Sequence, residues 1–132
     1  MKFMMMMHYG GQQDCEPIHT WPASDIHAHI QFMHDLNRKL KEAGELVDAQ
    51  GLTGPEQAKL VRASKGGGPP ITDGPFPETK EFLAGFWIID VENEKRAIEI
   101  AAFASAAPGP GGTPMSSPIE LRAVGVAPKT EG

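Results

Sequence analysis

The sequence has little that would hold it together covalently or anchor it in a membrane. Its 132 residues include one cysteine, Cys15, so no disulfide can form within the chain and no zinc site can rest on cysteine ligands. This scarcity predicts a reducing, cytoplasmic location. The apolar run at residues 4–7 is too short for a signal-peptide core or for the ~18 apolar residues of a membrane span. We therefore expect no membrane partner.

Positive charge is also scarce, with 12 Lys and Arg against 17 Asp and Glu and a net charge of −5. Nucleic-acid phosphates are bound by basic surfaces, so this balance argues against direct contact with nucleic acid. The chain lacks a P-loop, a dinucleotide GxGxxG, a metalloprotease HExxH and a nucleophile elbow. His27 and His34 are two helical turns apart and have no evident third ligand. We expect neither a cofactor nor a metal.

The patterns that are present predict one domain over residues 1–127, with a frayed tail at 128–132. Ser24 is expected to cap the first helix, and Gly44 to end it. We predict, in order, a strand at 2–9, a helix at 24–43, strands at 47–50, 59–64, 71–72 and 82–91, a helix at 92–105 and a strand at 119–126. This order predicts an α+β fold: a ferredoxin-like antiparallel sheet with two helices on one face and an extra hairpin strand.

The strand at 82–91 is apolar on both of its faces. In an antiparallel sheet with one solvent-exposed face, apolar and polar residues should alternate along each strand. Two helices can cover only one face of the predicted sheet, so the second apolar face needs another cover. The simplest cover is the same face of a second copy, related by a two-fold axis. The alternative is a monomer in which the loop at 107–118 folds over the sheet.

Three histidines fall in the helix at 24–43. Helical periodicity places His29 on the apolar stripe, while His27 and His34 fall on the opposite, polar face. We therefore expect His29 to be buried. One reading is that it bonds a backbone carbonyl at the edge of the core. The other is that it points into a cleft near the sheet as a catalytic acid or base. The other members of the stripe are Ile26, Ile30, Met33, Leu36 and Leu40.

The segment before the strand at 82–91 reads Asp73-Gly74-Pro75-Phe76-Pro77-Glu78-Thr79-Lys80-Glu81. Asp, Gly and Pro are turn residues, and Asp73 can cap its own turn by accepting from backbone N–H groups. A turn alone does not require Phe76 or the charged run that follows. The segment resembles the signature of the DGPF family, small bacterial proteins related to YCII-type domains. Residues 1–10, 83–91 and 119–124 are similar to strands of that family.

The resemblance implies a dimer whose two sheets face each other as an α/β barrel. It also adds weight to Asp73 as a catalytic residue, together with His29, at the mouth of the cleft between the sheets. Arg122 is either an exposed edge residue or the partner of Asp73 or of an anionic ligand. The ligand-binding residues expected around the cleft are Tyr9, Phe76, Glu78, Lys80 and Arg122.

YCII-type relatives are described with a histidine in the first helix and an acidic residue near the end of that helix. When Gly44 is aligned with the glycine that ends their helix, these two positions fall on Met33 and near Glu42. The family's pair is therefore not matched residue for residue.

Three functional hypotheses follow. The first is a homodimeric small-molecule-binding protein, in one form a lyase- or isomerase-type enzyme acting on a small organic acid, an anionic metabolite, in the inter-subunit cleft. The second, implied by the resemblance, is a non-catalytic regulatory protein linked to transcription by extracytoplasmic-function sigma factors. The third is a purely structural or oligomerising module. An open pocket with convergent polar side chains favours the first hypothesis; a filled cleft favours the other two.

Overall fold

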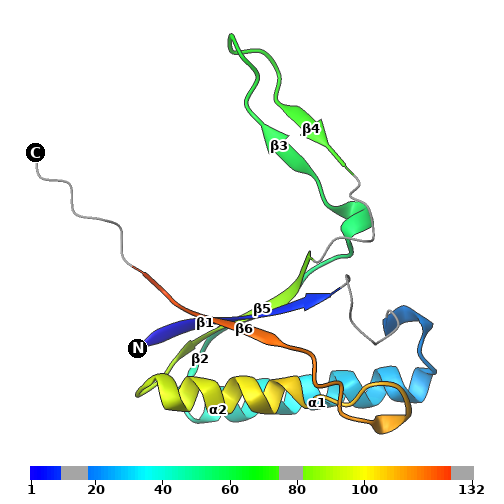
Figure 1. Cartoon of the computed structure of the whole chain (residues 1–132), viewed down its shortest axis with the longest axis vertical. Coiled ribbons are helices and arrows are strands. Elements are labelled where there is room, and N and C mark those ends of the chain that lie inside the picture. Colours follow the sequence, from blue (N-terminus) through cyan, green and yellow to red (C-terminus); the bar gives the residue numbers. More distant parts are fainter. Residues whose placement is uncertain (10–17, 75–81, 126–132) are drawn as a thin grey trace, which may run out of the picture.

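The structure is a computed structural model that describes residues 1–9, 18–74 and 82–125 (Figure 1). Strands and helices follow one another in the predicted order, and every predicted boundary is right to within three residues. None of the described helices has the length and apolar character needed to cross a bilayer. The elements are β1 (Lys2–Tyr9), η1 (Ile18–Thr20), α1 (Ala23–Glu42), β2 (Leu46–Gly51), η2 (Pro55–Gln57), β3 (Leu60–Arg62), β4 (Ile71–Asp73), β5 (Phe82–Asp90), α2 (Glu94–Ser105), η3 (Pro110–Gly112) and β6 (Ile119–Ala123).

Four strands form one antiparallel sheet in the order β2-β5-β1-β6. Both helices lie on the same face of this sheet, below it in Figure 1. Apart from β3 and β4, this is the ferredoxin-like βαββαβ arrangement. The α+β class, the antiparallel sheet and the placement of both helices on one face are therefore confirmed. The sheet of a single chain is open, so the dimeric barrel stays a prediction.

β3 and β4 do not join the sheet, which corrects the expectation of an extra strand in it. They form a separate two-stranded ribbon that stands away from the body, on the side of the sheet opposite the helices (Figure 1). Every residue of both strands is exposed. The chain is redirected at η2, where the buried Pro55 has a fixed φ and no N–H to offer a neighbouring strand.

The core lies between the sheet and the helices. Phe3 and Met5 of β1 are paired across the ladder with Ile89 and Trp87 of β5, so all four side chains project to the helix side. Met5 and Ile89 are fully buried. The helices complete this core with Leu36 and Leu40 from α1 and with Ala97, Ile100, Ala101 and Ala104 from α2. The small alanines let α2 approach the sheet closely.

The two ends of α1 differ in how well the sequence predicts them. The helix begins at Ala23 with Pro22 at the N-cap, so the expected cap at Ser24 is wrong: the fixed φ of Pro22 suits the position before the first turn. At the other end Gly44 has φ +72°. The Glu45 amide donates to Leu40 O at 2.8 Å and the Gly44 amide to Lys41 O at 3.1 Å, which is the Schellman geometry that favours glycine.

The apolar stripe predicted for α1 faces the protein interior, except at Ile30. His29, Leu36 and Leu40 are buried, and Met33 packs against the core. Ile30 is 44% exposed. One residue along a helix is a rotation of about 100°, so Ile30 falls at the margin of a stripe centred on His29 and Leu36.

The other face of the sheet presents an apolar centre with polar flanks. In the observed register Met4 lies opposite Ile88, and Met6 opposite Phe86, so these four side chains project away from the helices. The edge strands place polar residues beside them: Asp48 and Gln50 on β2, and Glu120 and Arg122 on β6. We call this surface the open face, since no element of the described chain covers it (Figure 1).

The loop at 107–118 packs on α1, which overturns the alternative that it covers the open face. Pro108 O accepts a hydrogen bond from His29 Nδ1 at 3.0 Å. The Gly111 amide donates to Asp25 Oδ2, also at 3.0 Å. Pro108 and Pro114 form an isolated β-bridge that closes the loop on itself. The loop is therefore committed to the helix side of the molecule.

An ion pair joins the two halves of the fold. Arg96 of α2 donates from Nε and Nη2 to the two carboxylate oxygens of Glu45, at 2.9 and 2.8 Å. This bidentate bond holds the pKa of Glu45 below its ordinary value, although burial opposes the shift. The Arg96 amide also donates to Asn93 Oδ1, which caps α2. Glu45 follows Gly44 directly, so the pair connects the end of α1 to the start of α2.

Replacing Glu45 with Gln should lower the free energy of unfolding by about 1 kcal/mol at pH 7. Arg96 loses its bidentate partner, keeps the 3.4 Å contact to Glu99 and remains partly solvated. A carboxyl whose pKa is lowered in the folded state stabilises the fold above its unfolded pKa, and that stabilisation is lost as the pH falls through the folded value. The difference between variant and wild type should therefore shrink below about pH 4. Urea unfolding at several pH values measures it.

The exposed Glu42→Gln variant is the control and should unfold like the wild type at every pH. A Glu45→Gln deficit that is the same at pH 7 and in acid would contradict the charge-based account.

Candidate functional site

A cavity of about 830 Å³ lies at one end of the sheet. Its walls come from the middle of α1, from η1, from the ends of β1 and β2, from the segment that follows β2, from β5 and from the loop before β6. Its size is in the range of small-molecule sites. The lining residues are Met7, His8, Ile18, His19, Trp21, His29, Met33, Asn37, Ala49, Gln50, Gly51, Leu52, Thr53, Gly54, Glu56, Phe82, Ala84, Gly85, Phe86, Trp87, Met115 and Ser117.

The lining draws on both faces of the sheet. Met33 and Trp87 belong to the helix side, where Trp87 is part of the core. Gln50 and Phe86 lie opposite each other in the ladder and project to the open face. Gly85, the residue before Phe86, is paired with Gly51 of β2. A Cβ at Gly85 would lie 3.0 Å from Gln50 O, so a side chain would crowd the neighbouring strand. The cavity therefore reaches from the helix side around the end of the sheet to the open face.

The walls are mainly aromatic and aliphatic, with polar groups at intervals. Both tryptophans of the chain, Trp21 and Trp87, line the cavity. Trp87 Nε1 donates to Asn37 Oδ1 at 2.7 Å, which fixes the indole and leaves the Asn37 amide group as a donor. Apolar walls with a few oriented polar groups are the usual composition of a ligand site.

His29 is the best-oriented titratable side chain in the cavity. It is only 9% exposed, and its ring meets Trp21 edge to face at 5.6 Å. The Pro108 carbonyl can only accept, so the 3.0 Å contact requires the hydrogen on Nδ1. In the neutral ring Nε2 is then an acceptor, and it makes no hydrogen bond within the described part of the chain. A single lone pair is thus held in a defined position beside the cavity.

The sequence predicts the environment of the α1 histidines correctly. His29 is buried, while His27 and His34 are exposed. His29 bonds a backbone carbonyl through one nitrogen, as the first reading requires, and it also lines the cavity. Its role as an acid or base stays a prediction. Met33, where the family resemblance places a histidine, lies one turn later and lines the same cavity.

Two further histidines, His8 and His19, line the cavity. His8 Nε2 lies 2.9 Å from Glu120 Oε1. His19 belongs to η1 together with Ile18, and sequence reasoning missed this segment because a 3-10 turn has no hydrophobic period to detect. Among the described residues no group of three or more His, Cys, Asp or Glu side chains is arranged to hold a metal ion.

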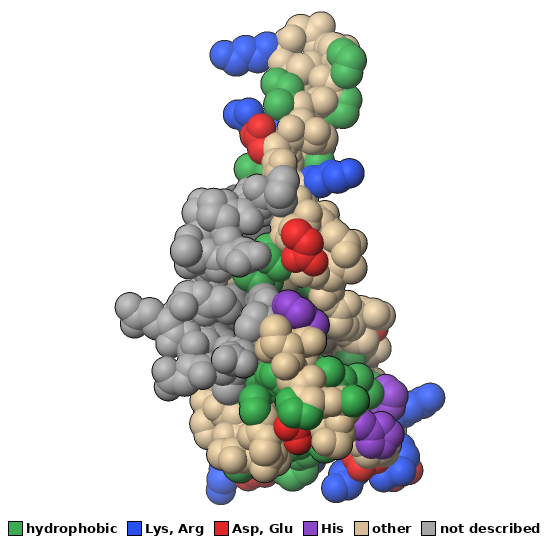
Figure 2. Space-filling view, turned by 90° about the vertical axis from the view of Figure 1, so that its right-hand side faces the viewer, with side chains coloured by type: hydrophobic (Ala, Val, Ile, Leu, Met, Phe, Trp, Pro, Cys, Tyr) green, Lys and Arg blue, Asp and Glu red, His purple; other side chains and the backbone are tan. Residues whose placement is uncertain are grey.

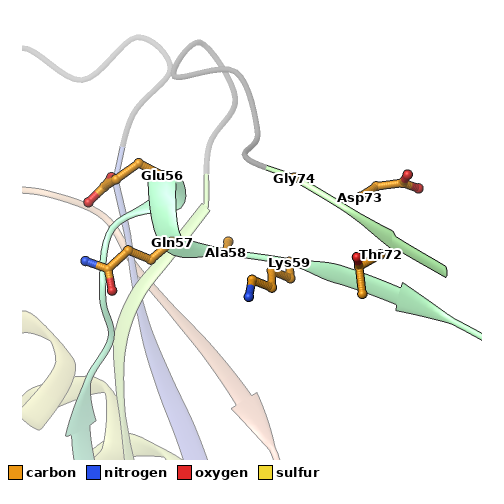
Figure 3. Close-up of a pocket in the computed structure, with 7 residues that line it drawn as sticks. All are labelled: Glu56, Gln57, Ala58, Lys59, Thr72, Asp73 and Gly74. Atoms are coloured by element: carbon orange, nitrogen blue, oxygen red, sulfur yellow. The ribbon is translucent and has the colours of Figure 1, made fainter. Parts of the chain in front are cut away.

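The structure does not bring Asp73 to His29, which corrects the expectation of a shared cavity. Asp73 is the last residue of β4, and its carboxylate lies 3.3 Å from Arg62 Nη2 with half of its surface exposed. It lines a separate hollow of about 150 Å³ together with Glu56 and Lys59. In Figure 3 the Asp73 and Glu56 carboxylates lie at opposite ends of this hollow, and neither points at the other.

Gly74 has a structural reason to be glycine. Its φ is +154°, and a Cβ at this position would collide with the Ala58 carbonyl oxygen. The Asp-Gly pair is thus explained in part by the close passage of two backbone segments. Asp73 forms its ion pair with Arg62, so the pair with Arg122, one of the alternatives raised by the sequence, is not formed within the described chain. Arg122 lies opposite Met4 in the ladder and therefore on the open face, where it is exposed.

The other predicted ligand-binding residues are only partly placed. Phe76, Glu78 and Lys80 lie outside the described residues. Tyr9 is the last residue of β1, next to the cavity-lining His8, and its side chain also lies outside the description. Their roles stay predictions.

The chain is similar to known sequences over most of its length. The sequence model of the YCII-related domain matches residues 1–108. A protein of Rhizobium meliloti (strain 1021), described as uncharacterized, is 32% identical over 109 residues, which cover 83% of this chain and 87% of the relative.

The predicted site role of Asp73 can be separated from its structural one. Asp73→Asn keeps a side-chain acceptor and removes the charge that pairs with the exposed Arg62. Because exposed pairs contribute little, the melting temperature should fall by no more than a few degrees. If Asp73 serves a ligand, ligand-induced stabilisation should disappear in the same variant. If ligands still stabilise the Asp73→Asn variant, the role of Asp73 is purely structural.

Proposed function

This chain belongs to the YCII-related family, and we propose that it is a homodimeric protein that binds a small organic molecule in the cavity beside His29. The observation that carries the proposal is the His29 ring, fixed in one tautomer by Pro108 at the wall of a largely apolar cavity. An open cavity with several polar side chains is what the small-molecule hypothesis requires. A purely structural module has no need of it.

The geometry supports acid–base chemistry at His29 Nε2. In the neutral ring this atom can take a proton from a C–H or O–H group of a bound molecule, and can return it to another atom of the same molecule. The Pro108 carbonyl stays bonded to Nδ1–H throughout and keeps the ring in place. Proton abstraction followed by return or by loss of a leaving group is the common core of isomerase and lyase reactions. We propose this reaction class.

The ligand we propose is a small organic acid. Within the described lining no Lys or Arg side chain is present, and Glu56 is the only carboxylate. A carboxylate group of the ligand would therefore be held by neutral donors and by histidine. The Asn37 amide and Thr53 are suitable donors, and His19 can donate in either protonation state. The apolar remainder of the ligand would contact Met33 and the two indoles.

The proposal of a homodimer rests on the composition of the open face. Met4, Met6, Phe86 and Ile88 form an apolar centre surrounded by polar edge strands, the usual anatomy of an interface. The loop at 107–118 is committed to α1 and does not cover this centre. A second sheet packed against it would bring the open-face part of the cavity, at Gln50 and Phe86, next to the partner. Sedimentation as a monomer at micromolar concentration would contradict this assembly.

The function is tested with His29→Asn. Asn can keep a donor near the position of Nδ1, so the bond to Pro108 is retained, while the acceptor Nε2 is removed. A panel of carboxylate and hydroxy-acid metabolites is screened by thermal shift and by quenching of Trp21 and Trp87 emission, since a ligand of the native state raises stability. For each binder, ¹H NMR in D₂O follows exchange of the proton next to the carboxylate.

We expect the wild type to catalyse exchange and His29→Asn to slow it by roughly 100-fold, the usual contribution of a general base. Binding should change much less. His34→Asn, on the exposed face of the same helix, is the matched control and should behave as the wild type. If no compound in the panel binds, that result counts against the small-molecule function. If His29→Asn exchanges the proton as fast as the wild type, His29 is not the base.

A further inference from the structure

The most unusual feature outside the cavity is the ribbon formed by β3 and β4. We call residues 59–73 the arm. Figures 1 and 2 show it projecting from the body, and in Figure 1 it lies on the side of the sheet that the helices leave open. All residues of both strands are exposed. A two-stranded ribbon by itself is marginally stable in water, so an arm of this kind gains from a surface to pack against.

The arm carries large apolar side chains on both of its faces. Leu60 is 51% exposed, Val61 59% and Ile71 44%. The ladder pairs Leu60 with Asp73 and Arg62 with Ile71, so Leu60 and Ile71 share one face; Val61 is paired with Thr72 on the other. A solvated ribbon would keep at least one face polar. Contiguous exposed apolar groups mark an interaction surface instead.

The charge of the arm is opposite to that of the rest of the chain. Residues 59–73 contain Lys59, Arg62 and Lys65 but only one acidic residue, Asp73, while the whole chain has a net charge of −5. Figure 2 shows the basic side chains of the arm next to its apolar ones. A surface that is apolar and basic is complementary to a surface that is acidic, and such complementarity orients a specific partner. The body of a second copy of this chain is acidic.

We propose that the arm packs against a second copy of this chain. The inference rests on the proposed homodimer and goes beyond it, because a sheet-to-sheet dimer does not by itself require the arm. The arm rises on the same side as the open face, so a copy seated on that face lies within its reach (Figure 1). A two-fold axis would let each arm hold the other body.

The arm is also connected to the cavity through the chain. The segment that leads from β2 into the arm contributes Leu52, Thr53, Gly54 and Glu56 to the cavity lining. Anchoring the arm on a partner fixes this segment from outside. The dimer contact and the shape of the binding site are thus connected through a few consecutive residues.

The test compares two full-length variants by sedimentation velocity over a dilution series. Leu60→Thr/Ile71→Thr removes the apolar side chains from one face of the arm and keeps strand-forming residues. Ile98→Thr removes an equally exposed isoleucine, at 56%, from α2. The dimer dissociation constant should rise at least about tenfold in the arm variant and stay unchanged in the control. A wild-type dimer whose dissociation constant is the same in the arm variant would overturn the proposal and leave the homodimer standing.

A second measurement needs no substitution. Equal amounts of ¹⁴N- and ¹⁵N-labelled wild-type protein are mixed and treated with a lysine-reactive cross-linker, and mass spectrometry identifies mixed-isotope peptides. Mixed pairs containing Lys59 or Lys65 are expected; only same-isotope pairs from these lysines would overturn the proposal. A wild type that stays monomeric defeats the homodimer and the arm contact together. Retardation of single-stranded DNA that is lost in Lys59→Ala/Lys65→Ala, with the dimer unchanged, would assign the arm to nucleic acid and reject the second copy.

Discussion

The antiparallel pairing of β1 with β5 is the constraint on which the rest of the structure depends. Because Met5 lies opposite Trp87 and Phe3 opposite Ile89, one face of both central strands is committed to the helices. Met4, Met6, Phe86 and Ile88 are then necessarily turned outward. A slip by one residue would exchange the two sets. Both sets are apolar, so burying only one of them leaves a surface that a second copy can complete.

The candidate site depends on contacts between segments far apart in the chain. His29 and Pro108 are 79 residues apart, and their hydrogen bond decides which ring nitrogen is available. The same loop is held to the start of α1 by the bond from Gly111 to Asp25. The loop therefore positions the histidine. In the same cavity the bond from Trp87 of β5 to Asn37 of α1 fixes the indole.

Periodicity and end signals explain what the sequence could predict. The strands and helices follow from apolar spacing, Gly44 from the left-handed position that ends α1, and the burial of His29 from its place beside Leu36. The predictions that were wrong depend on contacts between segments far apart in the chain, which local patterns do not show. No local signal shows that Pro55 turns the chain out of the sheet, so the separation of Asp73 from His29 could not be foreseen. His19 and Trp21 reach the cavity through packing alone.

The central claim is that the two faces of the sheet have different partners: one face packs on the helices, and the other, apart from the end where the cavity opens, packs on a second copy. The seven methionines test it directly. In a spectrum of ¹³C-methyl methionine with a soluble paramagnetic agent, Met4 and Met6 should be protected at high protein concentration, as is the fully buried Met5, and should broaden on dilution. Met1, 63% exposed, should broaden throughout. Met4 and Met6 that broaden like Met1 at every concentration would contradict the claim.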